Sequence, residues 1–182
     1  TAMGQSTTAS GAYSTAMGQN TAASGYASTA MGYETTASGS RSTAMGRYTT
    51  ASGDRSTAMG TSTTASGYAS TAMGSNTEAS GYYSTAMGYL TTASDYGSLV
   101  IGRYNSSGSS ATNADSFSTA NTAFVIGNGA DSSNISDAFS ILFDGTTNIA
   151  GSVTATSFVG DGSGLTGITG NFVDLTTAQT IA

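Results

Sequence analysis

The chain has 182 residues, only 8% of them charged, and contains no Cys, Pro, Trp or His. Its net charge of -6 argues against nucleic acid and anionic membranes as partners, and the absence of Cys excludes disulfides and thiolate metal sites. The aliphatic residues are mostly Ala, so a conventional globular core is not expected at this length.

A fourteen-residue unit, S-T-A-M-G-x-x-T-T-A-S-G-x-x, repeats from Thr1 to about Tyr96. A fixed period of this kind is typical of a solenoid. Each half of the unit has strand-like residues, then a Gly and two variable positions. Thr favours strands, whereas a Gly every seven residues would cost a helix about 1 kcal/mol each time. The repeat therefore predicts an all-β parallel β-roll, or solenoid, with two short strands in each 14-residue coil.

Side chains alternate across a strand, so Ala16 points away from Thr15 and Met17. We expect Ala inside the roll, with Thr and Met outside on one sheet and Thr and Ser outside on the other. The reverse arrangement, with Met inside, stays open. An outer methionine stripe is too large for a soluble monomer, so self-association is expected. The predicted seam of a homotrimer contains Met3, Met17, Met31, Met45, Met59, Met73, Met87, Ile101 and Ile126.

The S-T-A-M-G-x-x-T-T-A-S-G units resemble the head repeat of trimeric autotransporter adhesins, of the YadA type. Residues 1–102 carry the resemblance. It implies a left-handed parallel β-roll within a threefold bundle. The chain departs from the family pattern with Met where Ile or Val is common, and with Thr where Val is common.

The array changes at its end, where Asp95 replaces the expected Gly and Ser98–Gly102 replaces S-T-A-M-G with S-L-V-I-G. A second such segment, Ala123–Gly127, follows at a spacing of 25 residues rather than 14. Terminal coils of solenoids are usually atypical. We therefore divide the chain into a repeat array at 1–95, a capping coil with an inserted polar loop at 96–137, and a truncated β-rich connector at 138–182.

In the connector we predict a strand at 138–143, a hairpin-type turn at 144–148 and a second strand-like run at 149–159. The run S-V-T-A-T-S-F-V-G-D-G-S-G-L-T-G at 152–167 resembles a connector of phage tail-fibre-type proteins. Both chain ends look like cuts in a longer polypeptide, and no transmembrane or signal-like run is visible.

No catalytic, cofactor-binding or metal-binding residues are predicted. The Gly160–Gly164 loop lacks the Lys of a phosphate-binding P-loop, and the Asp- and Asn-rich segment 128–137 does not have EF-hand spacing. With no His and no Cys, the usual nucleophile–base pairs are missing, so the chain is not expected to be an enzyme.

The variable turn positions are rich in Tyr, often beside Arg. These rings either pack over turns and seams or form an attachment surface for a host-surface glycan or protein. The second interpretation assigns the surface to Tyr26, Tyr33, Tyr68, Tyr82 and Tyr83. The predicted function is an extracellular structural fibre or adhesin, on a bacterial surface or a phage-like particle, that displays attachment surfaces on a rigid trimeric rod. The alternative is an ice-binding solenoid that uses its Thr ladders.

Overall fold

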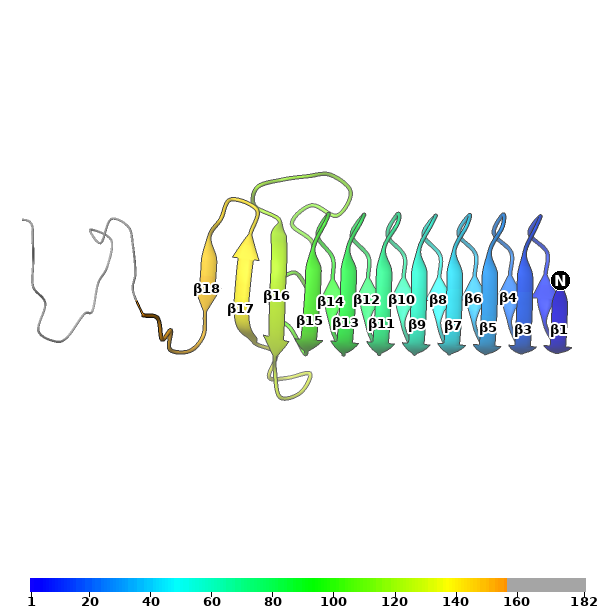
Figure 1. Cartoon of the computed structure of the whole chain (residues 1–182), viewed down its shortest axis with the longest axis horizontal. Helices are drawn as coiled ribbons and strands as arrows, with labels where there is room; N and C mark the ends of the chain where they lie inside the picture. Colours follow the sequence, from blue (N-terminus) through cyan, green and yellow to red (C-terminus); the bar gives the residue numbers. More distant parts are fainter. Residues whose placement is uncertain (157–182) are drawn as a thin grey trace, which may run out of the picture. The chain divides into compact units, whose positions relative to one another are not determined.

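The computed structural model describes residues 1–156, and Thr1–Ser152 form one compact unit. Every regular element in the described residues is a β-strand. Figure 1 shows the strands side by side along this unit, from β1 in blue to β18 in orange.

Each coil of the repeat contributes one long and one short strand. The long strands are β1 (Ala2–Gln5), β3 (Thr15–Gln19), β5 (Thr29–Tyr33), β7 (Thr43–Arg47), β9 (Thr57–Thr61), β11 (Thr71–Ser75), β13 (Thr85–Tyr89) and β15 (Leu99–Arg103). The short strands are β2 (Thr8–Ala9), β4 (Ala22–Ala23), β6 (Thr36–Ala37), β8 (Thr50–Ala51), β10 (Thr64–Ala65), β12 (Glu78–Ala79) and β14 (Thr92–Ala93). The long strands begin an 11-stranded sheet and the short strands form a 7-stranded sheet.

The pairing keeps the sequence repeat in register. Met31 lies opposite Met45 and Ala37 lies opposite Ala51, both in parallel pairs, so each coil advances the chain by 14 residues. This confirms the predicted parallel β-solenoid. Neighbouring strands in such a sheet are about 4.8 Å apart.

The interior of the roll is built from alanine. The core alanines from Ala16 to Ala93 are 0% exposed, which confirms the arrangement with Ala inside. Two further rows also point inward: the Ser that precedes each long strand, such as Ser42, and the Thr that precedes each short strand, such as Thr49. These residues lie two positions before a core Ala, on the same side of the strand. The sequence analysis did not place these hydroxyl groups inside.

Two rows of glycine let the coils stack closely. Gly18 has φ +123°, and a Cβ there would lie 2.0 Å from the carbonyl oxygen of Gly32. Gly25 has no positive φ, yet a Cβ there would also lie 2.0 Å from the oxygen of Gly39. Both glycines of the repeat are thus required by the approach of the next coil, and the first also by its backbone conformation.

The 11-stranded sheet continues past the array with a change of direction. Strand β16 (Thr122–Asn128) pairs in parallel with β15, whereas β17 (Asp137–Leu142) pairs antiparallel with both β16 and β18 (Thr147–Ile149). The predicted strand and hairpin are confirmed, with a tighter turn than expected: Leu142 N–H donates to the Thr146 oxygen at 2.9 Å. The strand predicted at 149–159 is wrong for residues 150–156. Sheet pairing ends at Ile149, and a Cβ added at the nearby Gly151 would meet no atom within 4 Å. The rest of that run, and residues 157–167 of the connector-like motif, lie outside the described residues.

A loop between β15 and β16 closes the end of the 7-stranded sheet. The Asn105 amide lies beside β14 as another strand would: Oδ1 accepts the Thr92 N–H at 2.8 Å, and Nδ2 donates to the Thr92 oxygen at 2.9 Å. Buried Asp95 accepts backbone N–H groups from Thr112, Asn113 and Thr122. The Asp that interrupts the glycine row thus anchors the inserted loop.

Candidate interaction surfaces

A row of apolar side chains runs along the outer face of the 11-stranded sheet. Register places each Met opposite the Met of the next coil, and then joins Met87 to Ile101 and Ile101 to Ile126. The methionines at 17, 31, 45, 59, 73 and 87 are half-buried, and Met3 is 59% exposed. We call this set, Met3 to Ile126 as predicted for the seam, the methionine row.

The apolar face extends further than the sequence analysis expected. Ile126 lies opposite Phe139, and Phe139 lies opposite Ile149, so the row continues across the antiparallel strands. A second row beside it changes from Thr85 to Leu99 and then to Phe124. The antiparallel pairing of β17 breaks the sequence period, so no spacing rule could have found this extension.

The outer face of the 7-stranded sheet is polar. Its Thr row includes Thr36, Thr50 and Thr64, but Ala22 and Glu78 occupy equivalent positions. Each short strand contributes only two residues. This face therefore does not supply the regular Thr ladder that the ice-binding alternative requires. Such a ladder does lie on the outer face of the 11-stranded sheet, where Thr15 to Thr85 pair without interruption beside the methionine row.

The variable residues form two rows of turns at opposite edges of the roll. The turns after S-T-A-M-G are called the MG turn row (residues 5–6, 19–20, 33–34, 47–48, 61–62, 75–76, 89–90 and 103–104). Those after T-T-A-S-G, or its variant T-T-A-S-D, are called the SG turn row (residues 12–13, 26–27, 40–41, 54–55, 68–69, 82–83 and 96–97). All ten Tyr and all four Arg of the chain lie on these two rows.

The predicted attachment tyrosines do not all share one edge. Tyr26, Tyr68, Tyr82 and Tyr83 lie on the SG turn row, whereas Tyr33 lies on the MG turn row. Tyr26, Tyr82 and Tyr83 are 48%, 42% and 51% exposed. The structure therefore brings four of the five together and separates the fifth.

Every Arg stacks on a Tyr ring of its turn row. On the SG row the Arg41 guanidinium carbon lies 5.6 Å from the Tyr26 ring centre, and that of Arg55 lies 5.0 Å from Tyr68. On the MG row the Arg47 guanidinium carbon lies 5.7 Å from the Tyr33 ring centre and 4.5 Å from that of Tyr48. Such contacts contribute about 0.5–1 kcal/mol at exposed sites and hold the guanidinium in place.

Neighbouring side chains also raise the pKa of two tyrosines. A hydrogen bond with Glu34, together with its negative charge, raises the pKa of Tyr33 above 10.0. The pKa of Tyr104 is raised chiefly by its hydrogen bond with Tyr89.

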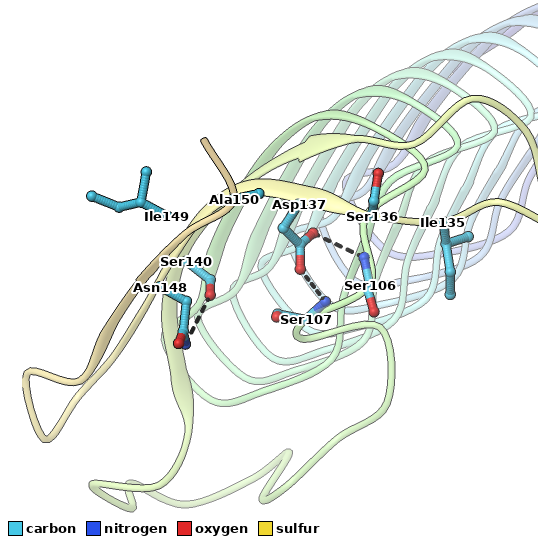
Figure 2. A pocket seen from close by; sticks show the side chains of 9 residues that line it. All are labelled: Ser106, Ser107, Ile135, Ser136, Asp137, Ser140, Asn148, Ile149 and Ala150. Atoms are coloured by element: carbon cyan, nitrogen blue, oxygen red, sulfur yellow. Dashed lines mark hydrogen bonds between the residues drawn. The ribbon is translucent and has the colours of Figure 1, made fainter. Parts of the chain in front are cut away.

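A cavity of about 390 Å³ lies at the C-terminal end of the unit (Figure 2). Its lining includes Asp137, whose carboxylate accepts N–H groups from Ser106 and Ser107 at 2.9 and 2.7 Å. Both carboxylate oxygens are thus used to hold the inserted loop. The arrangement explains a structural role and shows no reactive pair.

Among residues 1–156 no three His, Cys, Asp or Glu side chains gather closely enough to hold a metal ion. The carboxylates of Asp131 and Asp144 instead bond to their own turns, for example Asp144 to the Thr146 N–H at 2.7 Å. Across the same described part of the chain, no helix has the length and apolar character needed to cross a membrane.

The repeat array matches a known family. Residues 1–21, 23–49, 51–77 and 79–105 match the family model described as YadA head domain repeat (2 copies), which covers more than half of the chain. The chain belongs to the YadA head repeat family. It is an adhesin-type β-solenoid repeat protein, as the coil pattern predicted. No individual curated protein matches the sequence.

Proposed function

We propose that the chain is a segment of an extracellular, homotrimeric adhesin fibre on a bacterial surface, with the methionine row as the seam between its three chains. Membership of the YadA head family supports the setting. The observation that carries the trimer is the unbroken register of Met3 to Ile126 along one outer face. Half-buried Met side chains in a continuous stripe are the surface that a soluble protein buries against another chain.

The seam is tested by three substitutions, Met31→Asp, Met45→Asp and Met59→Asp. The natural chain should sediment as about three chains, and the variant should be monomeric or unfolded. Burying an unpaired carboxylate costs on the order of several kcal/mol at each site.

A matched control places the same three charges on the opposite outer face. Thr36→Asp, Thr50→Asp and Thr64→Asp change the same coils and carry the same mutual repulsion, but lie on the 7-stranded sheet. This control should remain trimeric. If the methionine variant also sediments as an intact trimer, the seam lies elsewhere.

The attachment surface is proposed on the SG turn row, where Tyr26, Tyr68, Tyr82 and Tyr83 lie. Exposed Tyr offers a rigid aromatic face and a hydroxyl at low entropic cost. Three copies of the row in a trimer, each repeated along the rod, would convert weak contacts with a glycan or protein into avidity. The fifth predicted residue, Tyr33, belongs to a separate test because it lies at the other edge.

The experiment compares substitution to Ser of the four SG-row tyrosines with substitution of Tyr33 alone. Attachment to a glycan array and to immobilised host-surface proteins should fall only for the SG-row variant, with an unchanged trimer mass. If the natural chain and both variants attach equally well, the tyrosines do not form an attachment surface and only pack between turns.

A further inference from the structure

Every tyrosine ring of the chain contacts the ring of another tyrosine. Each of the ten has a ring neighbour on an adjacent coil, with ring centres 5.3–5.8 Å apart. The contacts are Tyr13–Tyr26, Tyr33–Tyr48, Tyr68–Tyr82, Tyr68–Tyr83, Tyr83–Tyr96 and Tyr89–Tyr104. At this separation the edge of one ring touches the next ring.

The backbone fixes three of these pairs directly. Tyr48 N–H donates to the Tyr33 oxygen at 2.9 Å, so the two residues whose rings meet are also joined by a main-chain hydrogen bond. Tyr83 bonds to Tyr68 in the same way at 2.8 Å, and Tyr104 to Tyr89 at 3.3 Å. The Cα atoms of each pair cannot separate without unstacking the coils, while the exposed rings keep freedom to turn.

The composition leaves one common route to a covalent link between coils. The chain has neither Cys for a disulfide nor Lys for a side-chain amide bond. Phenol rings can still be joined by oxidation. We propose that the stacked tyrosine pairs are oxidative coupling sites, at which a haem peroxidase using hydrogen peroxide joins rings of neighbouring coils as dityrosine.

The reaction balances within each pair. Each phenol loses one electron and one proton to give a phenoxyl radical, so a pair supplies the two electrons and two protons that reduce one peroxide to two waters. The radicals join through the ring carbons beside the hydroxyl groups. The two hydrogens displaced from those carbons move to the phenol oxygens and restore both aromatic rings. The crosslinked pair is two hydrogen atoms lighter than the starting pair.

Exposure and proximity favour coupling within a pair. Tyr48, Tyr83 and Tyr89 are 39%, 51% and 45% exposed, so the oxidant can reach at least one ring of each backbone-linked pair. A radical formed there has its partner already in contact, which replaces a slow bimolecular encounter. The product would link coils that are otherwise held by main-chain hydrogen bonds and a core of alanine.

The test uses the purified full chain at high dilution with peroxidase and hydrogen peroxide, followed by digestion and mass spectrometry. We expect dityrosine fluorescence and crosslinked peptides that join Tyr33 to Tyr48 and Tyr89 to Tyr104, each with the loss of two hydrogens. Tyr48→Phe keeps an aromatic ring in place but removes the phenol, so it should abolish the first link and preserve the second. Tyr104→Phe should do the reverse.

The same oxidation of the chain unfolded in urea serves as the control, because it keeps every tyrosine and removes the stacking. Its coupling pattern should be scattered. An identical pattern in folded and unfolded chains, links only between molecules, or no coupling in the folded chain would overturn the proposal. Tyr48 and Tyr104 lie outside the proposed attachment surface, so this result is independent of the attachment result.

Discussion

The repeat array and the C-terminal cap differ in the groups that hold neighbouring strands and coils together. In the array, residues 1–95, each coil repeats the one before, and at glycines such as Gly53 the backbone of the next coil lies so close that it leaves no room for a Cβ. Beyond the array, in residues 96–149 (called the cap here), side chains replace the missing coil partners: Asn105 bonds to β14, and Asp95, the last residue of the array, holds the inserted loop. The array therefore requires the same small residues, Gly and Ala, at fixed places in every coil, whereas its end requires specific polar side chains.

The two regions also differ in what they bury. The largest fully buried side chains of the described unit are Val100 and Val125, both in the cap. The array buries Ala together with inward-facing hydroxyl groups. Burial of apolar surface stabilises a fold by about 25 cal/mol per Å². Because Ala side chains bury little apolar area, the interior of each coil contributes little to the free energy of folding. The outer methionine row is consequently important for the array, because it offers the apolar area that the interior lacks.

The largest expected effect comes from adding one methyl group to the array. Gly53→Ala places a Cβ 2.0 Å from the Gly67 carbonyl oxygen, a backbone atom held in the stack. Because Gly53 has no positive φ, the damage is steric rather than conformational. We expect a loss of more than about 3 kcal/mol in the free energy of unfolding, or failure to fold, since overpacking against backbone cannot be relieved by a rotamer change.

The matched substitution outside the stack is Gly151→Ala, where an added Cβ meets nothing within 4 Å. Chemical denaturation of both variants should show a large effect for the first and almost none for the second. Similar stability of the two variants would mean that the coils can separate freely, against the close-stacking picture.

The second-largest effect is expected when the Asp95 carboxylate, which holds the inserted loop, is removed. Asp95→Ala leaves the backbone N–H groups of Thr112, Asn113 and Thr122 without their acceptor. A buried donor without a partner costs about 1–3 kcal/mol, so a total loss of about 3 kcal/mol is expected, with faster amide exchange in the inserted loop. Asp54→Ala in the array is the control, because that exposed carboxylate accepts only the Ser40 N–H and its loss should cost under about 1 kcal/mol.

The third expected effect is a small increase in the free energy of unfolding when a buried hydroxyl group is removed. The buried Thr63 hydroxyl has no hydrogen-bond partner within the described residues. Thr63→Val keeps the branched shape and removes the unpaired oxygen, so the free energy of unfolding should rise by about 1 kcal/mol. Thr64→Val, on the outer face of the same coil, should change it little. A destabilised Thr63→Val variant would show that the inner hydroxyl is paired in solution.

Sequence reasoning succeeded where the repeat alone dictates the structure. Period, strand type and the buried position of Ala16 follow from a 14-residue unit with Gly at fixed places. It failed where contacts depend on the third dimension. The inward rows of Ser42 and Thr49 follow from the same alternation as the buried Ala two positions later, but they were missed because the alternation was applied only within the strands, and these polar residues precede them. The separation of Tyr33 from Tyr26 follows from which half-repeat each one ends, a distinction that the residue types alone did not suggest.

The smallest expected effect is a difference in acid sensitivity: lowering the pH should speed amide exchange in the cap but not in the array. Hydrogen bonds from Asn134 lower the pKa of Asp131, and the Thr146 N–H lowers the pKa of Asp144, both from an ordinary value of 3.8. A carboxyl whose folded pKa is depressed adds stability above its unfolded value and loses it as the pH falls through the folded value. Both carboxylates are fully exposed, so the effect is local. Amide exchange at Leu142 and Thr146 should therefore accelerate below pH 3.8 relative to the intrinsic rate, while that of the array strands changes little. Asp144→Asn keeps an acceptor oxygen but cannot titrate, and it should remove most of this dependence at the hairpin. Hairpin exchange that responds to acid equally in both proteins would assign the sensitivity to another group.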